Sequence, residues 1–232
     1  MDFLVGIDSE WFLYLNSMRS GFGDIFFEMF SGRWVWIPMY AVMVYVLFRD
    51  FKWQQAVVFV LGVALTILLA DQICSHLMRP LVQRPRPSSV ASPIVHLAHF
   101  SGNMRSATSY GFPSCHAANT MALAMLFSLY LKRWALTIFL FLWALVTCWS
   151  RIYLAAHYPG DLFIGAVVGI AVAAVVFAAC SYFARMWTGN AYKNREVKAR
   201  INIAGQRVSL YPSYLVIATG VLTIIYMAIL GI

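Results

Sequence analysis

Residues 150–161, with the sequence SRIYLAAHYPGD, lie between two long apolar runs. Within twelve residues this stretch brings together a cation, an imidazole and a carboxylate, which belong to Arg151, His157 and Asp161. Ionisable groups at membrane depth are costly and often functional. The pattern therefore predicts two membrane helices whose adjoining ends carry a polar site.

The composition is that of a membrane protein. Of the 232 residues, 62% are hydrophobic and 11% are charged, whereas soluble domains contain about 25% charged residues. Much of the surface must therefore face something other than water. We expect one polytopic membrane domain that occupies residues 1–232.

The net charge of +8 does not indicate a nucleic-acid partner. Six of the 17 lysines and arginines fall within residues 185–207, between two apolar runs. Such a cluster is typical of a cytoplasmic loop, and the sequence contains no recognised nucleic-acid-binding motif. We therefore expect the bilayer, rather than nucleic acid, to be the partner.

Hydropathy predicts an all-α fold: a bundle of about six transmembrane helices, since each span needs roughly 20 apolar residues. The bundle takes up residues 34–231. Residues 1–30 are apolar but carry five acids, which favours one or two interfacial helices. The expected spans are residues 34–48, 54–77, 117–131, 134–149, 161–184 and 209–231.

The distribution of cations sets the orientation. Basic turns at 49–52, 132–133 and 185–207 fall on one side of the membrane, which we take as the cytoplasm. By alternation, the N-terminus and the segments 79–113 and 150–160 face outside. A helical bundle favours a bacterial inner membrane, so we expect the outside to be the periplasm. The outer segments nevertheless carry five arginines, and something must hold this charge there.

Three polar clusters lie at the outer ends of the expected spans, and two of them contain arginines suited to binding phosphate. A guanidinium group is a planar fork of donors that matches phosphate oxygens. Contacts with lipid headgroups, or simple snorkelling, would explain the same residues. These arginines are Arg79, Arg86 and Arg151.

The third cluster is PSCH, at residues 113–116, which opens the span at 117–131. Ser114 is a favourable helix N-cap, and the free amides of a helix N-terminus, such as that of Cys115, hold anions. His116 would stand beside such an anion as a general acid. The alternative is an N-cap next to an ordinary interfacial histidine.

His157 and Asp161 are four residues apart, so they share a face if the helix is continuous. Asp161 would otherwise cap the following span and still reach the imidazole. In both cases a carboxylate on one ring nitrogen raises the basicity of the other, which makes a nucleophile or a base. A structural ion pair remains the alternative for this pair alone.

Together these motifs resemble the phosphatidic-acid phosphatase type 2 (PAP2) superfamily, in its membrane lipid phosphatase branch. The pattern of that superfamily, which also contains vanadium haloperoxidases, is K-x6-R-P, P-S-G-H and S-R-x5-H-x3-D. The first motif runs here from Arg79 to Pro87, with arginine in the lysine position. The second has Cys115 at the glycine, and the third matches in full from Ser150 to Asp161.

The resemblance implies a role for each residue. His157 would attack phosphorus and form a phosphohistidine, while Asp161 orients it. His116 would protonate the departing oxygen and then activate water. The phosphoryl oxygens would be bound by Arg79, Arg86, Ser114, Cys115 and Arg151.

The expected activity is hydrolysis of a phosphomonoester or diphosphate headgroup. Three arginines would supply the charge that Mg²⁺ supplies elsewhere, so we expect no metal and no cofactor. Candidate substrates are undecaprenyl diphosphate, phosphatidylglycerophosphate or phosphatidate, and a lipid A phosphate. The main alternative is a non-enzymatic phospholipid-binding or transport protein, and a haloperoxidase is a third option.

Four other residues have weaker assignments. Arg84 and Arg105 are candidates for binding the headgroup or a second phosphate. His96 and His99 have a spacing compatible with a metal pair, but no cysteine or carboxylate lies near them in the sequence. We therefore do not expect a metal site there.

Overall fold

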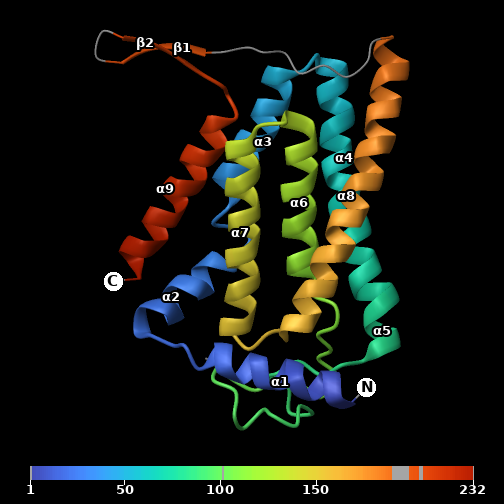
Figure 1. Ribbon diagram of the computed structural model, residues 1–232, viewed down its shortest axis with the longest axis vertical. Helices are drawn as coiled ribbons and strands as arrows, with labels where there is room; N and C mark the ends of the chain where they lie inside the picture. The colour runs from blue at the N-terminus through green and yellow to red at the C-terminus, as the bar shows by residue number, and fades with distance from the viewer. Residues whose placement is uncertain (1, 101, 190–198, 204–205, 232) are drawn as a thin grey trace.

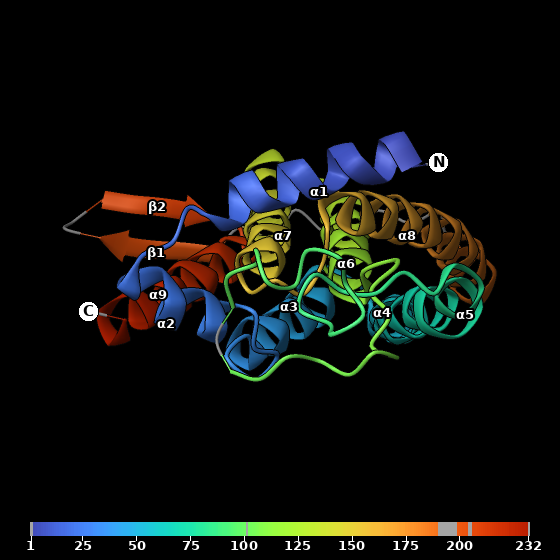
Figure 2. The ribbon, with the colours of Figure 1, turned by 90° about the horizontal axis from the view of Figure 1, so that it is seen from below.

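The computed structural model describes residues 2–100, 102–189, 199–203 and 206–231. Long helices run side by side, and α1 lies across one end of them (Figures 1 and 2). The helical elements are α1 (Asp2–Asn16), α2 (Gly21–Phe30), α3 (Ile37–Asp50), α4 (Trp53–Gln72), the π-helix η1 (Ile73–Met78), α5 (Arg79–Val82), α6 (Cys115–Leu131), α7 (Trp134–Tyr153), α8 (Pro159–Thr188) and α9 (Tyr214–Leu230).

The helical bundle predicted from the sequence is confirmed, but the count of about six spans is not. Within the described residues, three helical stretches are long and apolar enough to cross a membrane: Trp53–Val82, Trp134–Tyr153 and Pro159–Thr188. Helices α6 and α9 have 17 residues each and α3 has 14, and 17 residues reach only about 25 Å. The hydrocarbon core of a bilayer is about 30 Å thick.

Two local features differ from the sequence prediction. Helix α4 continues through η1 and α5 as far as Val82, so Arg79 stands on the last helical turns rather than in the loop that we expected to begin there. Helix α5 ends at Gln83, whose φ of 51° is left-handed. In addition, β1 (Ala199–Ile203) and β2 (Gln206–Leu210) form an antiparallel pair. We had expected an all-α fold, with a basic loop at 185–207 and the start of a span at 209.

Glycine allows α6 and α8 to approach closely. A Cβ atom built on Gly165 would lie 2.4 Å from the Ser114 carbonyl oxygen, and one on Gly169 would lie 2.1 Å from that of Ala118. Small residues four apart are the usual means of close helix contact in membranes. Because the contact includes Ser114, it brings the start of α6 against the start of α8, where the predicted site residues lie.

Helix α1 is fixed to the same end of the bundle. The Phe12 ring packs edge-on against Tyr158 at 5.4 Å. The buried Asn16 amide donates to the carbonyl oxygens of Ile152 and Tyr153, both at 3.0 Å, and its Oδ1 accepts from the His99 amide at 2.7 Å. The helix therefore has a defined position over the ends of α7 and α8.

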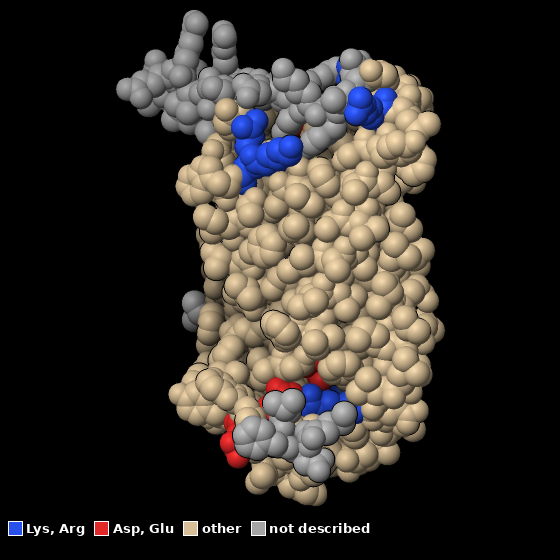
Figure 3. All heavy atoms as spheres, turned by 45° about the vertical axis from the view of Figure 1, so that its right-hand side comes forward, with Lys and Arg blue, Asp and Glu red and all other residues tan. Residues whose placement is uncertain are grey.

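The surface has the pattern of a protein embedded in a bilayer. Figure 3 shows a broad band of uncharged residues between two ends where charged side chains gather. The turns at residues 51–52 and 132–133 lie at one end of the bundle, with the end of α8, and α1 lies at the opposite end (Figure 1). The first two basic turns and the end of α8 thus share one side, while residues 190–198 and 204–205 of the third basic segment lie outside the described residues.

Candidate active site

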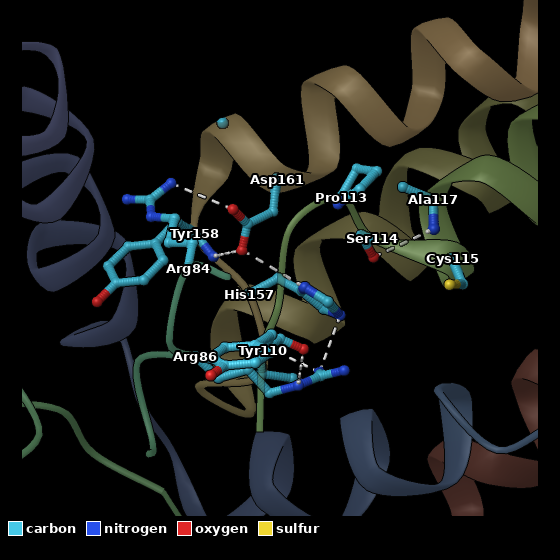
Figure 4. A network of polar contacts seen from close by, with 12 residues as sticks. Arg84, Arg86, Tyr110, Pro113, Ser114, Cys115, Ala117, His157, Tyr158 and Asp161 are labelled. Carbon is cyan, nitrogen blue, oxygen red and sulfur yellow. Dashed lines mark hydrogen bonds and ion pairs between the residues drawn. The ribbon is translucent and has the colours of Figure 1, made fainter. Parts of the chain in front are cut away.

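His157 lies in the turn between α7 and α8, and its side chain is buried. Its Nε2 lies 3.1 Å from Nη1 of Arg86, and its Nδ1 lies 3.5 Å from Oδ2 of Asp161 (Figure 4). A guanidinium group can only donate, so Nε2 is the acceptor and Nδ1 carries the proton toward the carboxylate. This tautomer leaves the Nε2 lone pair directed at the arginine side of the site.

The charge state of His157 follows from its surroundings. Burial lowers its pKa well below the ordinary value of 6.5, and the nearby Arg86 and Arg151 lower it further. The imidazole is therefore neutral at pH 7. The Nδ1–Oδ2 distance of 3.5 Å is longer than an ordinary hydrogen bond, as is common before a substrate is bound.

Asp161 stands in the first turn of α8 and is fully buried. Its Oδ2 accepts from the Tyr158 amide at 3.1 Å, which caps the helix, and its Oδ1 accepts from Arg84 at 3.1 Å. Its carbonyl oxygen accepts from the Ser114 amide at 3.0 Å. The helix start thus fixes the carboxylate behind His157 and joins it to the PSCH motif.

Arg86 is held by backbone groups on the opposite side of His157. Its Nε donates to the Tyr110 carbonyl oxygen at 3.2 Å, and Nη1 donates to that of Ala156 at 3.1 Å. Burial lowers its pKa to about 10, and Arg105 and Arg79 add to this effect. The guanidinium group remains charged at neutral pH, in a site that is already positive.

Arg79 and Arg151 approach from two further helices. Arg79 Nη2 donates to Sγ of Cys115 at 3.0 Å and to the Pro113 carbonyl oxygen at 3.3 Å. Arg151 is buried and donates to Oγ of Ser31 at 2.9 Å. In both arginines, Nε is buried and has no hydrogen-bond partner among the described residues.

The start of α6 has the geometry predicted for it. Ser114 is fully buried, and its Oγ accepts from the Ala117 amide at 3.4 Å as the helix N-cap. His116, in the first turn, lines a cavity of about 800 Å³ together with Cys115. An imidazole at the wall of a cavity is accessible to a bound ligand and to water.

The same cavity runs from this polar end into the bundle. Ser31 and Arg33 line it near the chain segment before α3, and its deeper walls are mostly apolar. Those walls include Tyr40, Met43, Val63, Leu123, Phe127 and Trp143. The arrangement suits a ligand with a charged headgroup and a long apolar tail.

Arg84 occupies a different place from the headgroup position that we expected. Its Nη1 donates to Oδ2 of Asp8 at 2.6 Å as well as to Asp161, and its guanidinium group lies 3.8 Å above the Tyr158 ring. It is thus tied to protein carboxylates behind His157. Arg105 is exposed and near enough to Arg86 to lower the pKa of that arginine. Arg105 therefore remains the headgroup candidate.

The two histidines with the spacing of a metal pair lie apart from this site. His96 and His99 line a separate hollow with Arg19 and Asp24. Within the described part of the chain, no group of three or more histidine, cysteine or acidic residues has the geometry of a metal site.

Sequence reasoning missed Asp8, Ser31 and Arg33. Each lies far along the chain from the three motifs, so no spacing connects it to them. The one available clue was that an acid such as Asp8, in an otherwise apolar segment, needs a partner. The structure shows Arg84 as that partner.

A membrane helix bundle that carries a histidine–carboxylate pair faced by arginines, beside an apolar cavity, defines an integral-membrane phosphatase acting on lipid. Comparisons with known proteins agree: residues 57–187 match the PAP2 superfamily. The chain belongs to that superfamily, in its membrane lipid phosphatase branch.

Two relatives and one solved structure place it more closely. The chain is 46% identical over 170 residues to a Bacteroides thetaiotaomicron protein named lipid A 4′-phosphatase, covering 73% of this chain and 75% of that protein. A Porphyromonas gingivalis protein of the same name is 28% identical over 189 residues, covering 82% and 79%. The crystal structure of Aquifex aeolicus LpxE shares the fold, with a TM-score of 0.52 and 24% identity, over 73% of this chain and 93% of that one.

Proposed function

We propose that the protein hydrolyses the 4′-phosphate of lipid A through a phosphohistidine intermediate on His157. The observation that carries the proposal is the position of His157, with Nε2 at 3.1 Å from Arg86 and Nδ1 at 3.5 Å from Asp161. Nε2 thus carries the lone pair that would attack phosphorus once a bound phosphate takes over the hydrogen bond from Arg86, and Nδ1 faces a carboxylate.

The phosphate site is formed by arginines that have no counter-ion. None of Arg79, Arg86 and Arg151 pairs with a carboxylate in the described part of the chain. Buried charges without partners are costly, and a phosphoryl group bound among them would remove that cost. It would also accept from the unpaired Nε groups of Arg79 and Arg151. This supports metal-independent catalysis, because the guanidinium groups neutralise the charge on the phosphoryl oxygens.

In the first step, Nε2 of His157 forms a bond to phosphorus while the bond from phosphorus to the sugar oxygen breaks. Asp161 stabilises the positive charge that develops on the imidazole. Burial, together with Arg151 and Arg86, lowers the pKa of His116 to about 3, so His116 takes up a proton only when the anionic phosphoryl group lies beside it. It then gives this proton to the departing oxygen, and its place on the cavity wall supports this role. The products are a free sugar hydroxyl and a phosphohistidine.

In the second step, His116, now neutral, takes a proton from a water molecule. The water oxygen attacks phosphorus as the phosphorus–nitrogen bond breaks, which releases inorganic phosphate and restores neutral His157. The residues that bind the phosphoryl oxygens, including Ser114 and the Cys115 amide at the start of α6, serve both steps.

The choice of lipid A rests on the two named relatives and on the cavity. Both relatives are lipid A 4′-phosphatases by name, and a chamber of about 800 Å³ with mostly apolar walls suits acyl chains beside the phosphate. We further propose that the protein resides in the inner membrane of a bacterium. The site, at the end opposite the basic turns, would then face the periplasm.

The test is phosphate release by the purified protein in detergent. Bisphosphorylated lipid A should lose one phosphate, and mass spectrometry should locate the loss at the 4′ position, with a chelator making no difference. Undecaprenyl diphosphate, phosphatidylglycerophosphate and phosphatidate serve as comparison substrates. If folded protein prefers one of these, the substrate assignment is wrong, and if it releases phosphate from none of the four lipids, the enzymatic proposal is wrong.

A further inference from the structure

Asp8 of α1 contacts the catalytic network from outside the region that matches the family, residues 57–187. Its Oδ2 lies 2.6 Å from Nη1 of Arg84, and the same Nη1 lies 3.1 Å from Oδ1 of Asp161. One guanidinium nitrogen therefore donates to both carboxylates. The Tyr158 ring, whose centre lies 3.8 Å from the Arg84 guanidinium carbon, also limits the movement of that guanidinium group.

Asp8 also contacts the helix start that carries Asp161. Its Oδ1 accepts from the Gly160 amide at 2.8 Å. A Cβ atom on residue 160 would lie 2.8 Å from Oδ2 of Asp8, so only glycine permits this approach. A carboxylate at the N-terminus of a helix is also favoured by the helix dipole.

The charges of Asp8, Arg84 and Asp161 together determine the net charge that faces His157. Arg84 by itself would neutralise Asp161, which would then stabilise a positive imidazole poorly. With Asp8 included, two carboxylates share one guanidinium group, and one negative charge remains. Because Arg84 occupies Oδ1 of Asp161, that charge is directed through Oδ2 toward Nδ1 of His157.

We propose that Asp8 is a positioning residue of the active site: through Arg84 and Gly160 it orients Asp161 and keeps the Asp8–Arg84–Asp161 group negatively charged, so that His157 becomes a better nucleophile. The inference rests on the proposed function of His157. It gives the N-terminal helix, which lies across the end of the bundle (Figure 2), a role in catalysis.

The test compares Asp8→Asn with the wild-type protein on the lipid substrate. The substitution removes one charge and keeps the shape. We expect kcat to fall by about 10-fold to 100-fold, the cost seen when a metal-binding histidine loses the partner that orients it, with KM nearly unchanged. The other groups whose charges act on His157, namely Arg86, Arg151, His116 and Arg79, are untouched. A more positive network should also move the acid limb of the kcat profile to lower pH.

Glu10→Gln is the matched control, because Glu10 is exposed on the same helix and the change removes the same charge. It should leave kcat unchanged. A double-mutant cycle with Arg84→Gln separates positioning from a general effect on folding. If Asp8 acts through Arg84, Asp8→Asn should cost no more than about twofold in the Arg84→Gln background. Gly160→Ala, which displaces the Asp8 carboxylate and keeps every charge, should lower kcat in the same direction.

Three results would overturn the inference: wild-type kcat in Asp8→Asn, equal losses in Asp8→Asn and Glu10→Gln, or fully additive losses in the double mutant. If Asp8→Asn fails to fold, as judged by its thermal unfolding in detergent, Gly160→Ala decides the question through kcat. A wild-type protein that releases no phosphate would instead contradict the proposed function itself.

Discussion

The imidazole of His157 lies between groups of opposite charge, with Arg86 on Nε2 and Asp161 facing Nδ1. The carboxylate sets the tautomer, and the arginines keep the ring neutral until phosphorus is bound. This combination explains why a buried histidine is placed among three guanidinium groups. The effect of each neighbour can be measured separately.

The first prediction concerns the protonation of His157. Its pKa is lowered by burial and by Arg86 and Arg151, so the folded protein should take up this proton only well below pH 6.5. Imidazole ¹⁵N NMR of histidine-labelled protein, assigned with His157→Gln, would measure it. Because the unfolded chain binds the proton near pH 6.5 and the folded chain does not, thermal stability should fall as the pH is lowered through that value. Proton uptake at or above pH 6.5 would contradict the account.

The second prediction concerns Cys115, which stands where the family pattern has glycine and contacts Arg79 through its sulfur atom. In our mechanism its amide binds phosphate and its thiol does not react. Cys115→Ser should therefore keep kcat within about threefold of wild type, since a hydroxyl accepts from Arg79 as a thiol does. A loss of 1,000-fold, typical for removing a nucleophile, would favour the thiol as the attacking group.

At this scale the sequence can predict only the contacts that local motifs carry. The resemblance supplied every member of the His157, His116 and Arg86 group, and the spacing placed Asp161 near His157. Arg84 was misplaced because its contacts depend on Asp8, 76 residues away in the sequence. No rule of spacing connects two such positions.

Among the helices, the contact between α6 and α8 decides whether the motifs meet. Ser114 and Asp161 begin the two helices and are joined by the bond from the Ser114 amide to the Asp161 carbonyl oxygen, at 3.0 Å. This bond requires the close approach that Gly165 and Gly169 permit. The geometry of the site thus depends on Gly165 and Gly169, which lie about one and two turns after Asp161 and carry no side chain.

The third prediction tests that contact. In Gly169→Ala the new Cβ would lie 2.1 Å from the Ala118 carbonyl oxygen, a backbone atom that cannot move freely. We expect a loss of about 1–3 kcal/mol in the free energy of unfolding, the usual cost of overpacking, together with lower activity. Thermal unfolding in detergent would measure it. Gly21→Ala is the control, since nothing lies within 4 Å of its new Cβ, and an equal change in both variants would contradict the prediction.

The order and type of the long helices could be predicted, because apolar runs and basic turns are local properties. The residues at which these helices end could not be predicted. Helix α4 continues past the predicted end at residue 77, through a π-helical turn, to Val82, and hydropathy carries no information on such a turn. The β1–β2 hairpin was missed because we read its polar residues only as a charge cluster.

Over the whole molecule, the cavity reaches from Cys115 and His116, at the start of α6, into the apolar interior of the bundle. It extends from His116 and Arg33 to residues such as Val63 and Trp143. A substrate whose phosphate lies at the arginines would place its acyl chains there. The position of α1 across the same end could not be predicted from the sequence, since it depends on packing and hydrogen bonds with α7 and α8.

The fourth prediction fills that cavity. Val63→Trp should lower kcat/KM for a long-chain lipid substrate by about tenfold, which corresponds to lost burial of roughly two methylene groups. Hydrolysis of a short, soluble phosphomonoester should not change. Val175→Trp is the control, because Val175 is 69% exposed on α8. Equal losses on both substrates would show that the variant damages the site and not the cavity.

The most direct test of the whole account is to trap the covalent intermediate on substrate labelled with ³²P at the 4′-phosphate. Rapid acid-free quenching followed by peptide mass spectrometry should place an acid-labile, alkali-stable phosphoryl group on His157. The label should be absent in His157→Ala and unchanged in His96→Ala, which alters an exposed histidine outside the site. Turnover without label on His157, or label on another residue, would contradict the central claim.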